Sequence, residues 1–342
     1  MQNATHMRLE IEEIPEATRR LLDRSGARLG EAGAALRQLQ PVMVATIARG
    51  SSDHAAAFLK YAIELVAGVP VASIGPSIMS IYGRELRLEG CASISISQSG
   101  KSPDIVAMTQ SALRNGALGI ALTNTPGSPL AASANIAVDL AAGVEQSVAA
   151  TKSFVSSVVA GLAILGHWTE DDALIASLRA LPDVFAEAIS LNWSPLVAAL
   201  DGRASLYVLG RGPALAVAQE AALKFKETCG IHAEAYSAAE VLHGPARIVE
   251  SGFPVLALAA RDAGEAGVAE IADRLARQGA TAFATTDRAA AAARLPFAPT
   301  GHPITDALSL IVSFYAFVEA LARHRGFDPD RPPHLRKVTE TV

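Results

Sequence analysis

Residues 93–104 have the sequence Ser93-Ile94-Ser95-Ile96-Ser97-Gln98-Ser99-Gly100-Lys101-Ser102-Pro103-Asp104, and the rest of the chain can be understood outward from them. The alternation of serine and isoleucine is typical of a β-strand, and a helical pattern follows the hydroxyls and the glycine. Gly100 can adopt a positive φ, and the next helix begins with unpaired backbone N–H groups. The turn is therefore suited to cradle an anion.

Four side chains in this turn can donate hydrogen bonds to a phosphate: Ser97, Gln98, Ser99 and Ser102. The turn lacks both G-x-x-x-x-G-K-[ST] and G-x-G-x-x-G, so neither a nucleoside triphosphate nor a dinucleotide is the expected ligand. Serine-rich turns between strands and helices also serve as ordinary helix caps. By itself the turn leaves both interpretations open.

Strand and helix patterns alternate on both sides of this turn. A strand begins at Val42 and ends in Gly50-Ser51-Ser52. Further strands are predicted over 70–74, 91–96, 118–123 and 136–140, with helices over 54–67, 104–115 and 154–168. This order predicts an α/β fold with a doubly wound parallel sheet, in which ligands bind at the carboxyl ends of the strands.

The second half of the chain repeats the first. Arg211-Gly212 lies 162 positions after Arg49-Gly50, and residues 254–260 fall on 92–98 at the same offset. Two similar α/β units are therefore predicted. Where the first unit has residues 97–100 with their hydroxyls, the second has Ala259-Ala260-Arg261-Asp262. Only the first unit is expected to hold phosphate.

We divide the chain into five parts on these patterns. They are an N-terminal helical arm (1–40), a first domain with the phosphate loop (41–168), a helical connector (169–200), a second domain (201–326) and a C-terminal tail (327–342). Ile14 to Leu39 is predicted to form one long helix or two short ones. Pro182 is predicted to interrupt the helical pattern of the connector.

Composition limits the possible functions. The chain has 342 residues, of which 50% are hydrophobic and 18% charged, so it can bury a large core. The net charge of −5 and the absence of basic runs exclude nucleic acid as an expected partner. No apolar run reaches the ~18 residues of a membrane span, so we expect no membrane contact and a cytoplasmic protein. Cys91 and Cys229 are expected to be core thiols, and no metal or cofactor is predicted.

The second unit has titratable residues of its own. Glu220, Lys224 and Glu227 fall on one side of a predicted helix, so a cation and a carboxylate can share one site. On spacing alone, a surface stripe of ion pairs is the commoner explanation. His243 stands before Gly244-Pro245 in a predicted loop, where an imidazole can change its charge near neutral pH.

Taken together and in order, these motifs resemble those of sugar-isomerase (SIS) proteins. The likeness is to the isomerase half of glutamine–fructose-6-phosphate aminotransferase and to SIS-type glucosamine-6-phosphate deaminases. It implies two tandem flavodoxin-like domains. The motifs that carry it are Gly50-Ser51-Ser52, Ser97-Gln98-Ser99-Gly100, Val148-Ala149-Ala150-Thr151-Lys152, Ala222-Leu223-Lys224-Phe225-Lys226-Glu227, His232-Ala233-Glu234-Ala235-Tyr236, His243-Gly244-Pro245 and His334-Leu335-Arg336-Lys337-Val338-Thr339.

The resemblance also implies roles for particular residues. Ser97, Gln98, Ser99 and Ser102 would hold the sugar phosphate, with Ser52 and Val148 near the sugar. Glu227 would be the base that moves a proton between C1 and C2, Lys224 would stabilise the charge of the intermediate, His243 would open the sugar ring, and Lys337 would meet the ketose carbonyl. An enclosed carboxylate beside a cation suits such a proton transfer.

Departures from the aminotransferase pattern bear on the reaction. The SIS pattern begins almost at Met1, so no glutaminase domain is expected, and Leu242 and Arg336 replace a lysine and a small residue. We therefore expect conversion of glucosamine 6-phosphate to fructose 6-phosphate and ammonia, in a homodimer with shared active sites. The alternatives are a fructosamine-6-phosphate deglycase, an aminotransferase-like isomerase without its glutaminase domain, and a non-catalytic sugar-phosphate sensor.

Overall fold

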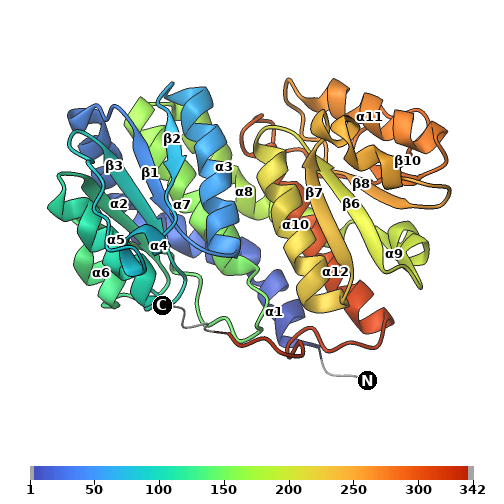
Figure 1. The fold of residues 1–342 in the computed structure, drawn as a ribbon, viewed down its shortest axis with the longest axis horizontal. Coiled ribbons are helices and arrows are strands. Elements are labelled where there is room, and N and C mark those ends of the chain that lie inside the picture. Colours follow the sequence, from blue (N-terminus) through green and yellow to red (C-terminus); the bar gives the residue numbers. More distant parts are fainter. Residues whose placement is uncertain (1–3, 338–342) are drawn as a thin grey trace. The chain divides into compact units, whose positions relative to one another are not determined.

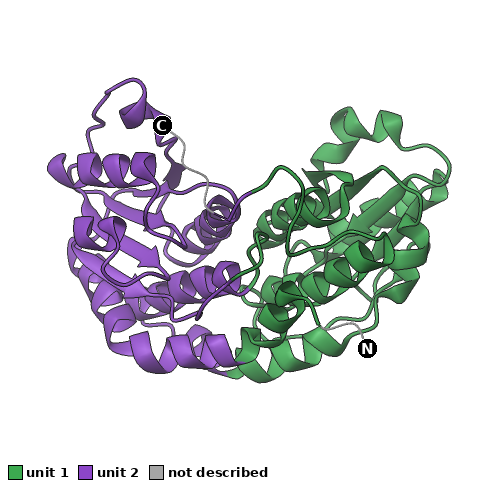
Figure 2. Cartoon of the chain, turned by 90° about the horizontal axis from the view of Figure 1, so that it is seen from below, with its two compact units in different colours: residues 1–15, 146–151, 180–335 green, residues 16–145, 152–179, 336–342 purple. Residues whose placement is uncertain are grey.

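The structure is a computed structural model that describes residues 4–337, and in it the chain forms two compact α/β units (Figure 1). Unit 1 contains residues up to 15, residues 146–151 and residues 180–335 (Figure 2). Unit 2 contains residues 16–145, residues 152–179 and the tail from 336. The chain therefore passes between the units five times, and each unit is assembled from separated segments.

Unit 2 has a five-stranded parallel sheet in the order β2-β1-β3-β4-β5. The strands are β1 (Val44–Ile47), β2 (Val71–Ser73), β3 (Ala92–Ile96), β4 (Leu118–Thr123) and β5 (Ile136–Asp139). Every residue of β1 and β3 is buried, as expected for the centre of a sheet covered on both faces. The predicted doubly wound sheet is confirmed, with strand ends within two residues of those expected.

Helices cover both faces of this sheet (Figure 1). They are α2 (Ile14–Leu39), α3 (Ser51–Val66), α4 (Ser77–Ser80), α5 (Pro103–Arg114), α6 (Pro129–Ser133) and α7 (Lys152–Thr169). α3 and α7 pack together on one face, and α5 packs with α4 and α6 on the other. α2 is one long helix, and the short α1 (His6–Glu12) before it belongs to unit 1.

Unit 1 repeats this topology with the order β7-β6-β8-β9-β10. Its strands are β6 (Ser205–Gly210), β7 (His232–Ser237), β8 (Pro254–Ala257), β9 (Thr281–Ala284) and β10 (Ala293–Arg294). Its helices include α9 (Ser194–Leu200), α10 (Pro213–Cys229), α11 (Glu265–Arg277) and α12 (Asp306–His324). The first strand of each unit is followed on one edge by the second strand and on the other by the third, so the predicted duplication is confirmed.

A glycine precedes the first helix after the first strand of each unit, in the same backbone conformation. Gly50 has φ 56° and ψ −134°, and Gly212 has φ 59° and ψ −136°. In both units a helix begins at the next residue. The prediction that the first of these helices starts at His54 was therefore wrong, because Ser51 and Ser52 already form its first turn. This difference places Ser52 at a helix N-terminus.

The prediction that Pro182 interrupts the connector was also wrong. Pro182 lies inside α8 (Asp172–Ser190), which runs on to its end at Ser190. Proline removes one helical hydrogen bond, but Leu178, Leu181 and Phe185 around it are fully buried. Tertiary packing of this apolar face outweighs the local cost.

α12 is the core helix of unit 1. It is long and apolar enough to cross a membrane, but 83% of its apolar stretch is buried inside the protein. Tyr315, Phe314 and neighbouring apolar side chains are buried, and α12 packs along α10. Cys229 and Cys91 are both buried and unpaired with each other, which confirms the prediction of core thiols.

The loop after β3 depends on Gly100, which has φ 62°. A Cβ at this position would lie 2.1 Å from the Ser128 hydroxyl oxygen and 2.8 Å from that of Thr123. Gly127, in the turn after β4, also has a positive φ of 77°, but nothing lies within 4 Å of its Cβ position. A comparison of substitutions at the two glycines therefore separates the cost of backbone strain from the cost of a steric clash.

We expect Gly100→Ala to destabilise the protein more than Gly127→Ala. Each substitution forces a left-handed residue, at a cost of about 1–2 kcal/mol, and only Gly100→Ala adds a clash worth about 1–3 kcal/mol more. Thermal or denaturant unfolding of both variants measures the difference. Equal losses of stability would contradict the close packing of the loop against Ser128.

Candidate functional site

The candidate phosphate loop, residues 97–102, lies between β3 and α5 at the carboxyl edge of the unit 2 sheet. Ser52 lies at the carboxyl end of β1, the strand next to β3. The chain leaves β1 and β3 toward opposite faces of the sheet, which opens the crevice where doubly wound folds bind ligands. The structure thus brings Ser52 to the same edge as the predicted phosphate loop.

The loop hydroxyls organise its backbone. Ser97 is buried and its hydroxyl oxygen accepts the N–H of Gly100 at 3.2 Å. The Ser99 oxygen accepts the N–H of Lys101 at 3.3 Å. Ser102 precedes the first turn of α5 but its side chain does not cap the helix. The Ser97 and Ser99 hydroxyls accept these loop N–H groups, so their own O–H groups are suited to donate to an anion.

A buried acid in the same place is neutralised by an arginine. Asp104 lies in the first turn of α5, where its side chain is fully buried, and Arg49 from the end of β1 forms an ion pair with it. An unpaired carboxylate here would repel a phosphate at the helix N-terminus. Sequence reasoning did not assign a role to Arg49, although its place just before Gly50 was a signal.

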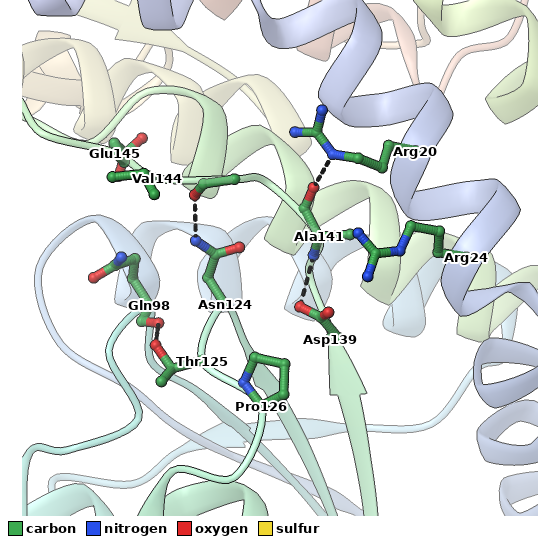
Figure 3. Close-up of a pocket in the computed structure, with 11 residues that line it drawn as sticks. Arg20, Arg24, Gln98, Asn124, Thr125, Pro126, Asp139, Ala141, Val144 and Glu145 are labelled. Atoms are coloured by element: carbon green, nitrogen blue, oxygen red, sulfur yellow. Dashed lines mark hydrogen bonds between the residues drawn. The ribbon is translucent and has the colours of Figure 1, made fainter.

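A pocket of about 390 Å³ adjoins the phosphate loop (Figure 3). Gln98 lines it together with Asn124, which follows β4. Arg20 and Arg24 of α2 add guanidinium groups, and Arg20 donates to the carbonyl of Ala141 at 2.7 Å. Other residues of the lining are Thr125, Pro126, Asp139, Gly143, Val144 and Glu145. The pocket therefore offers both donors and acceptors to a polar ligand beside the loop.

Lys337 belongs to unit 2, where it contacts Glu145. The ammonium lies 2.9 Å from the Glu145 carboxylate, whose side chain is fully buried. Glu145 also accepts the N–H of Ser153 at 3.1 Å and its hydroxyl at 2.6 Å. The acid therefore joins the tail to the first turn of α7. This partner of Lys337 was not predicted from the sequence.

Val148 belongs to unit 1, in the segment 146–151. A buried acid of α1, Glu10, holds this segment. Glu10 accepts the backbone N–H groups of Gln146 and Ser147 and the hydroxyl of Ser147, the last at 2.5 Å. The predicted sugar-binding segment is thus fixed by the N-terminal helix.

Lys224 and Glu227 meet on α10, as their spacing predicts. The Lys224 ammonium lies 2.5 Å from Glu227 Oε2 and 3.2 Å from Glu220 Oε1. The side chains of Lys224 and Glu220 are fully buried, whereas that of Glu227 is 19% exposed. The surface ion-pair stripe favoured by spacing alone is therefore wrong, because helix α12 covers this face of α10.

The electrostatics of this cluster keep its lysine charged. Burial by itself lowers the pKa of Lys224, but the carboxylates of Glu220 and Glu227 outweigh it and raise the pKa to about 12. A protonated ammonium thus lies beside a partly exposed carboxylate. Such a pair can accept a proton from carbon and stabilise the oxyanion that develops.

His243 lies at the end of a short 3₁₀ helix, Glu240–His243, and is exposed. Gly244 follows with φ 142°, a conformation that favours glycine. The hydroxyl of Tyr207 donates to the carbonyl of Pro245 at 3.0 Å and fixes the turn. The imidazole of His243 is thus exposed on a turn of unit 1 that this hydrogen bond fixes.

Glu227 also lines a second pocket in unit 1, of about 470 Å³, which we call the tail pocket. Its walls are mostly apolar and come from α10 and from the segment after α12. They are Leu223, Lys226, Glu227, Thr228, Gly230, Phe327, Asp328, Pro332, Pro333 and Leu335. Phe327 and Leu335 are 41% and 46% exposed, so the pocket leaves apolar surface uncovered.

In unit 1, the side chain of Arg261 occupies the loop that corresponds to the phosphate loop. Arg261 donates to the carbonyls of Ala259 at 2.9 Å and Thr285 at 2.7 Å. Its guanidinium also stacks on Phe297 and lies 3.7 Å from the Asp306 carboxylate. The expectation that this loop binds no anion remains a prediction, and the acids around Arg261 favour it.

Comparisons with known proteins agree with the fold and the motifs. The sequence pattern of the SIS domain matches residues 42–165 and 200–320. A glutamine–fructose-6-phosphate aminotransferase [isomerizing] of Symbiobacterium thermophilum is 34% identical over 98% of this chain and 58% of its own length. The corresponding protein of Pyrobaculum aerophilum is 32% identical over 89% of this chain and 54% of its own length. The chain thus spans about half the length of these curated relatives.

Solved structures give the same assignment. A protein of Silicibacter pomeroyi DSS-3, provisionally described as a phosphosugar isomerase, superposes with a TM-score of 0.93 and 57% identity, over 96% of this chain and all of that one. The C-terminal domain of the aminotransferase from Francisella tularensis has a TM-score of 0.84 at 24% identity, over 97% of this chain and 99% of that one, which supports the fold. With two matched segments that cover most of its length, this chain belongs to the SIS domain family.

Proposed function

We propose that this chain is an isomerase of phosphorylated amino sugars, which converts glucosamine 6-phosphate and water to fructose 6-phosphate and ammonia. The observation that carries the proposal is the contact between the Glu227 carboxylate and the buried Lys224 ammonium. A base beside a fixed cation is what a C1–C2 proton transfer needs. The names of the relatives, which are isomerizing aminotransferases and a provisional phosphosugar isomerase, support this class of reaction.

In the proposed reaction, His243 opens the sugar ring by taking the proton of the C1 hydroxyl and delivering a proton to the ring oxygen, as the C1–ring-oxygen bond breaks and C1 becomes an aldehyde. Glu227 then takes the proton from C2 of the open aldose and delivers it to C1, while Lys224 stabilises the intermediate oxyanion. One proton of the amine passes to the C1 oxygen, so the product has an alcohol at C1 and an imine at C2. Water adds to this imine and ammonia leaves, so the ketose forms without any redox change. Lys337 meets the ketose carbonyl in this scheme.

In this proposal the phosphate loop binds the phosphate group of the substrate. Ser97, Ser99 and Ser102 would donate to the phosphate, Gln98 would add an amide, and Ser52 would lie near the sugar. Val148 would contribute from the segment held by Glu10. His243 is exposed in the single chain, so it is available to a second copy, and we include a cytoplasmic homodimer with shared sites in the proposal.

One observation favours a second candidate function. The tail pocket places apolar walls beside Glu227, where the amine of a fructosamine 6-phosphate could extend. A deglycase would use the same base to move a proton from C1 to C2, and water would then release the amine from C1. Free ammonia needs no such space.

The decisive experiment offers purified protein both substrates. We expect ammonia and fructose 6-phosphate, in equal amounts, from glucosamine 6-phosphate. A fructosamine 6-phosphate should be cleaved far more slowly. Release of amine and glucose 6-phosphate from the fructosamine alone would replace the deaminase with the deglycase, and inactivity on both would refute the proposed function.

Ser99→Ala should weaken substrate binding. Loss of one charge-assisted hydrogen bond of about 1.5–3 kcal/mol raises KM by roughly 10- to 150-fold. Steady-state kinetics and inhibition by inorganic phosphate measure the change. Ser133→Ala, in α6 of the same unit but outside the loop, is the matched control. If KM and phosphate inhibition stay as in the parent, the loop does not bind the phosphate.

Glu227→Gln should lower kcat by about 10²- to 10⁴-fold with little change in binding, because the amide keeps the shape and loses the basicity. In D₂O the parent enzyme should place deuterium at C1 of the ketose. Glu270→Gln, on the exposed face of α11, is the control. A fully active Glu227→Gln protein would remove Glu227 from the mechanism.

A further inference from the structure

Behind the Lys224 cluster lies a tyrosine that the proposed mechanism does not use. Tyr315 comes from α12, its side chain is fully buried, and its hydroxyl donates to Glu220 Oε1 at 3.1 Å. α10 and α12 pack along each other, where Phe225 of α10 contacts Phe314 and Phe317 of α12, and the Phe314 ring in turn lies beside that of Tyr315. In such apolar surroundings a phenol needs a hydrogen-bond partner, and Glu220 supplies it.

Two donors share one oxygen of Glu220. Oε1 lies 3.1 Å from the Tyr315 hydroxyl and 3.2 Å from the Lys224 ammonium. The same ammonium lies 2.5 Å from Glu227 Oε2. Lys224 is therefore held between two carboxylates, and it lies nearer to the one that is partly exposed.

The position of Lys224 follows from competition between these acids. At low dielectric a buried carboxylate attracts an ammonium strongly. A hydrogen bond from Tyr315 neutralises part of the charge on the very oxygen of Glu220 that faces Lys224. This weakens the pull of Glu220 and leaves Lys224 closer to Glu227.

We propose that Tyr315 is a positioning residue, which acts through Glu220 to hold the Lys224 ammonium against Glu227. The proposal rests on the proposed function, because it requires Glu227 and Lys224 to act on the substrate. In this proposal Tyr315 acts on the base through its hydrogen bond to Glu220. Its role is to fix where the positive charge stands when the oxyanion forms.

The test is Tyr315→Phe, which deletes one hydroxyl and keeps the ring. Without it Glu220 draws Lys224 away from Glu227, so the transition state loses stabilisation while the phosphate contacts in unit 2 remain. We expect kcat to fall roughly 3- to 10-fold, the effect of one ordinary hydrogen bond, with KM unchanged. Ser313→Ala, which removes another buried hydroxyl of α12, should leave both constants as they are.

A double-mutant cycle shows whether Glu220 carries the effect. In a Glu220→Gln background, Tyr315→Phe should cause no further loss of kcat, because the charge that it modulates is gone. Independent effects that multiply would overturn the proposal. A Tyr315→Phe protein that fails to fold, or that changes KM rather than kcat, would overturn it too, since the hydroxyl would then have a structural or binding role.

The Glu227→Gln variant separates the two levels of inference. If Glu227→Gln keeps the parent kcat, the proposed function fails. If Glu227→Gln is inactive while Tyr315→Phe is as active as the parent, the proposed function stands and the role of Tyr315 is wrong.

Discussion

The carboxyl edge of each sheet depends on one topological constraint. In unit 2 the chain leaves β1 and β3 toward opposite faces, and in unit 1 it does the same after β6 and β8. No helix can then cover the gap between the two departing segments, which is why doubly wound sheets bind ligands there. Gly50 and Gly212 reflect this constraint, because both lead from the first strand into the following helix with nearly identical dihedral angles.

The two units have used this shared geometry differently. Unit 2 keeps small hydroxyl residues around its crevice and neutralises Asp104 with Arg49. In unit 1 Arg261 occupies the equivalent place, and a buried charged cluster lies on α10 instead, where Lys224 is held between two carboxylates. A buried ion is tolerated only when it is paired and hydrogen-bonded. The two units therefore differ in how each of them satisfies its buried charges.

Much of the fold could be predicted because the signals are local. The alternation at 93–96 and the offset between Arg49-Gly50 and Arg211-Gly212 are enough for two parallel sheets. The wrong predictions for Pro182 and for the Lys224 ion pairs have a common physical cause, because distant parts of the chain decide which side chains are buried. Nothing near Pro182 shows that the apolar face of the helix around it is buried, and the spacing of Lys224 does not show that α12 covers it. Lys337 lies 192 positions from its partner Glu145 in the sequence. Asp104 lies 55 positions from Arg49, and Glu220 lies 95 positions from Tyr315.

The repeated passage of the chain between the units has a consequence for biosynthesis. Because each unit draws on separated segments, neither is complete when the first half of the chain has left the ribosome. Unit 1 needs α1 from the beginning, with Thr5 bonded to Glu319 across 314 positions, and unit 2 needs Lys337 from the end for its bond to Glu145. Contacts of such long range slow folding and keep apolar surface exposed for longer. The two units are therefore completed together, by contacts between segments that lie far apart in the sequence, rather than one after the other.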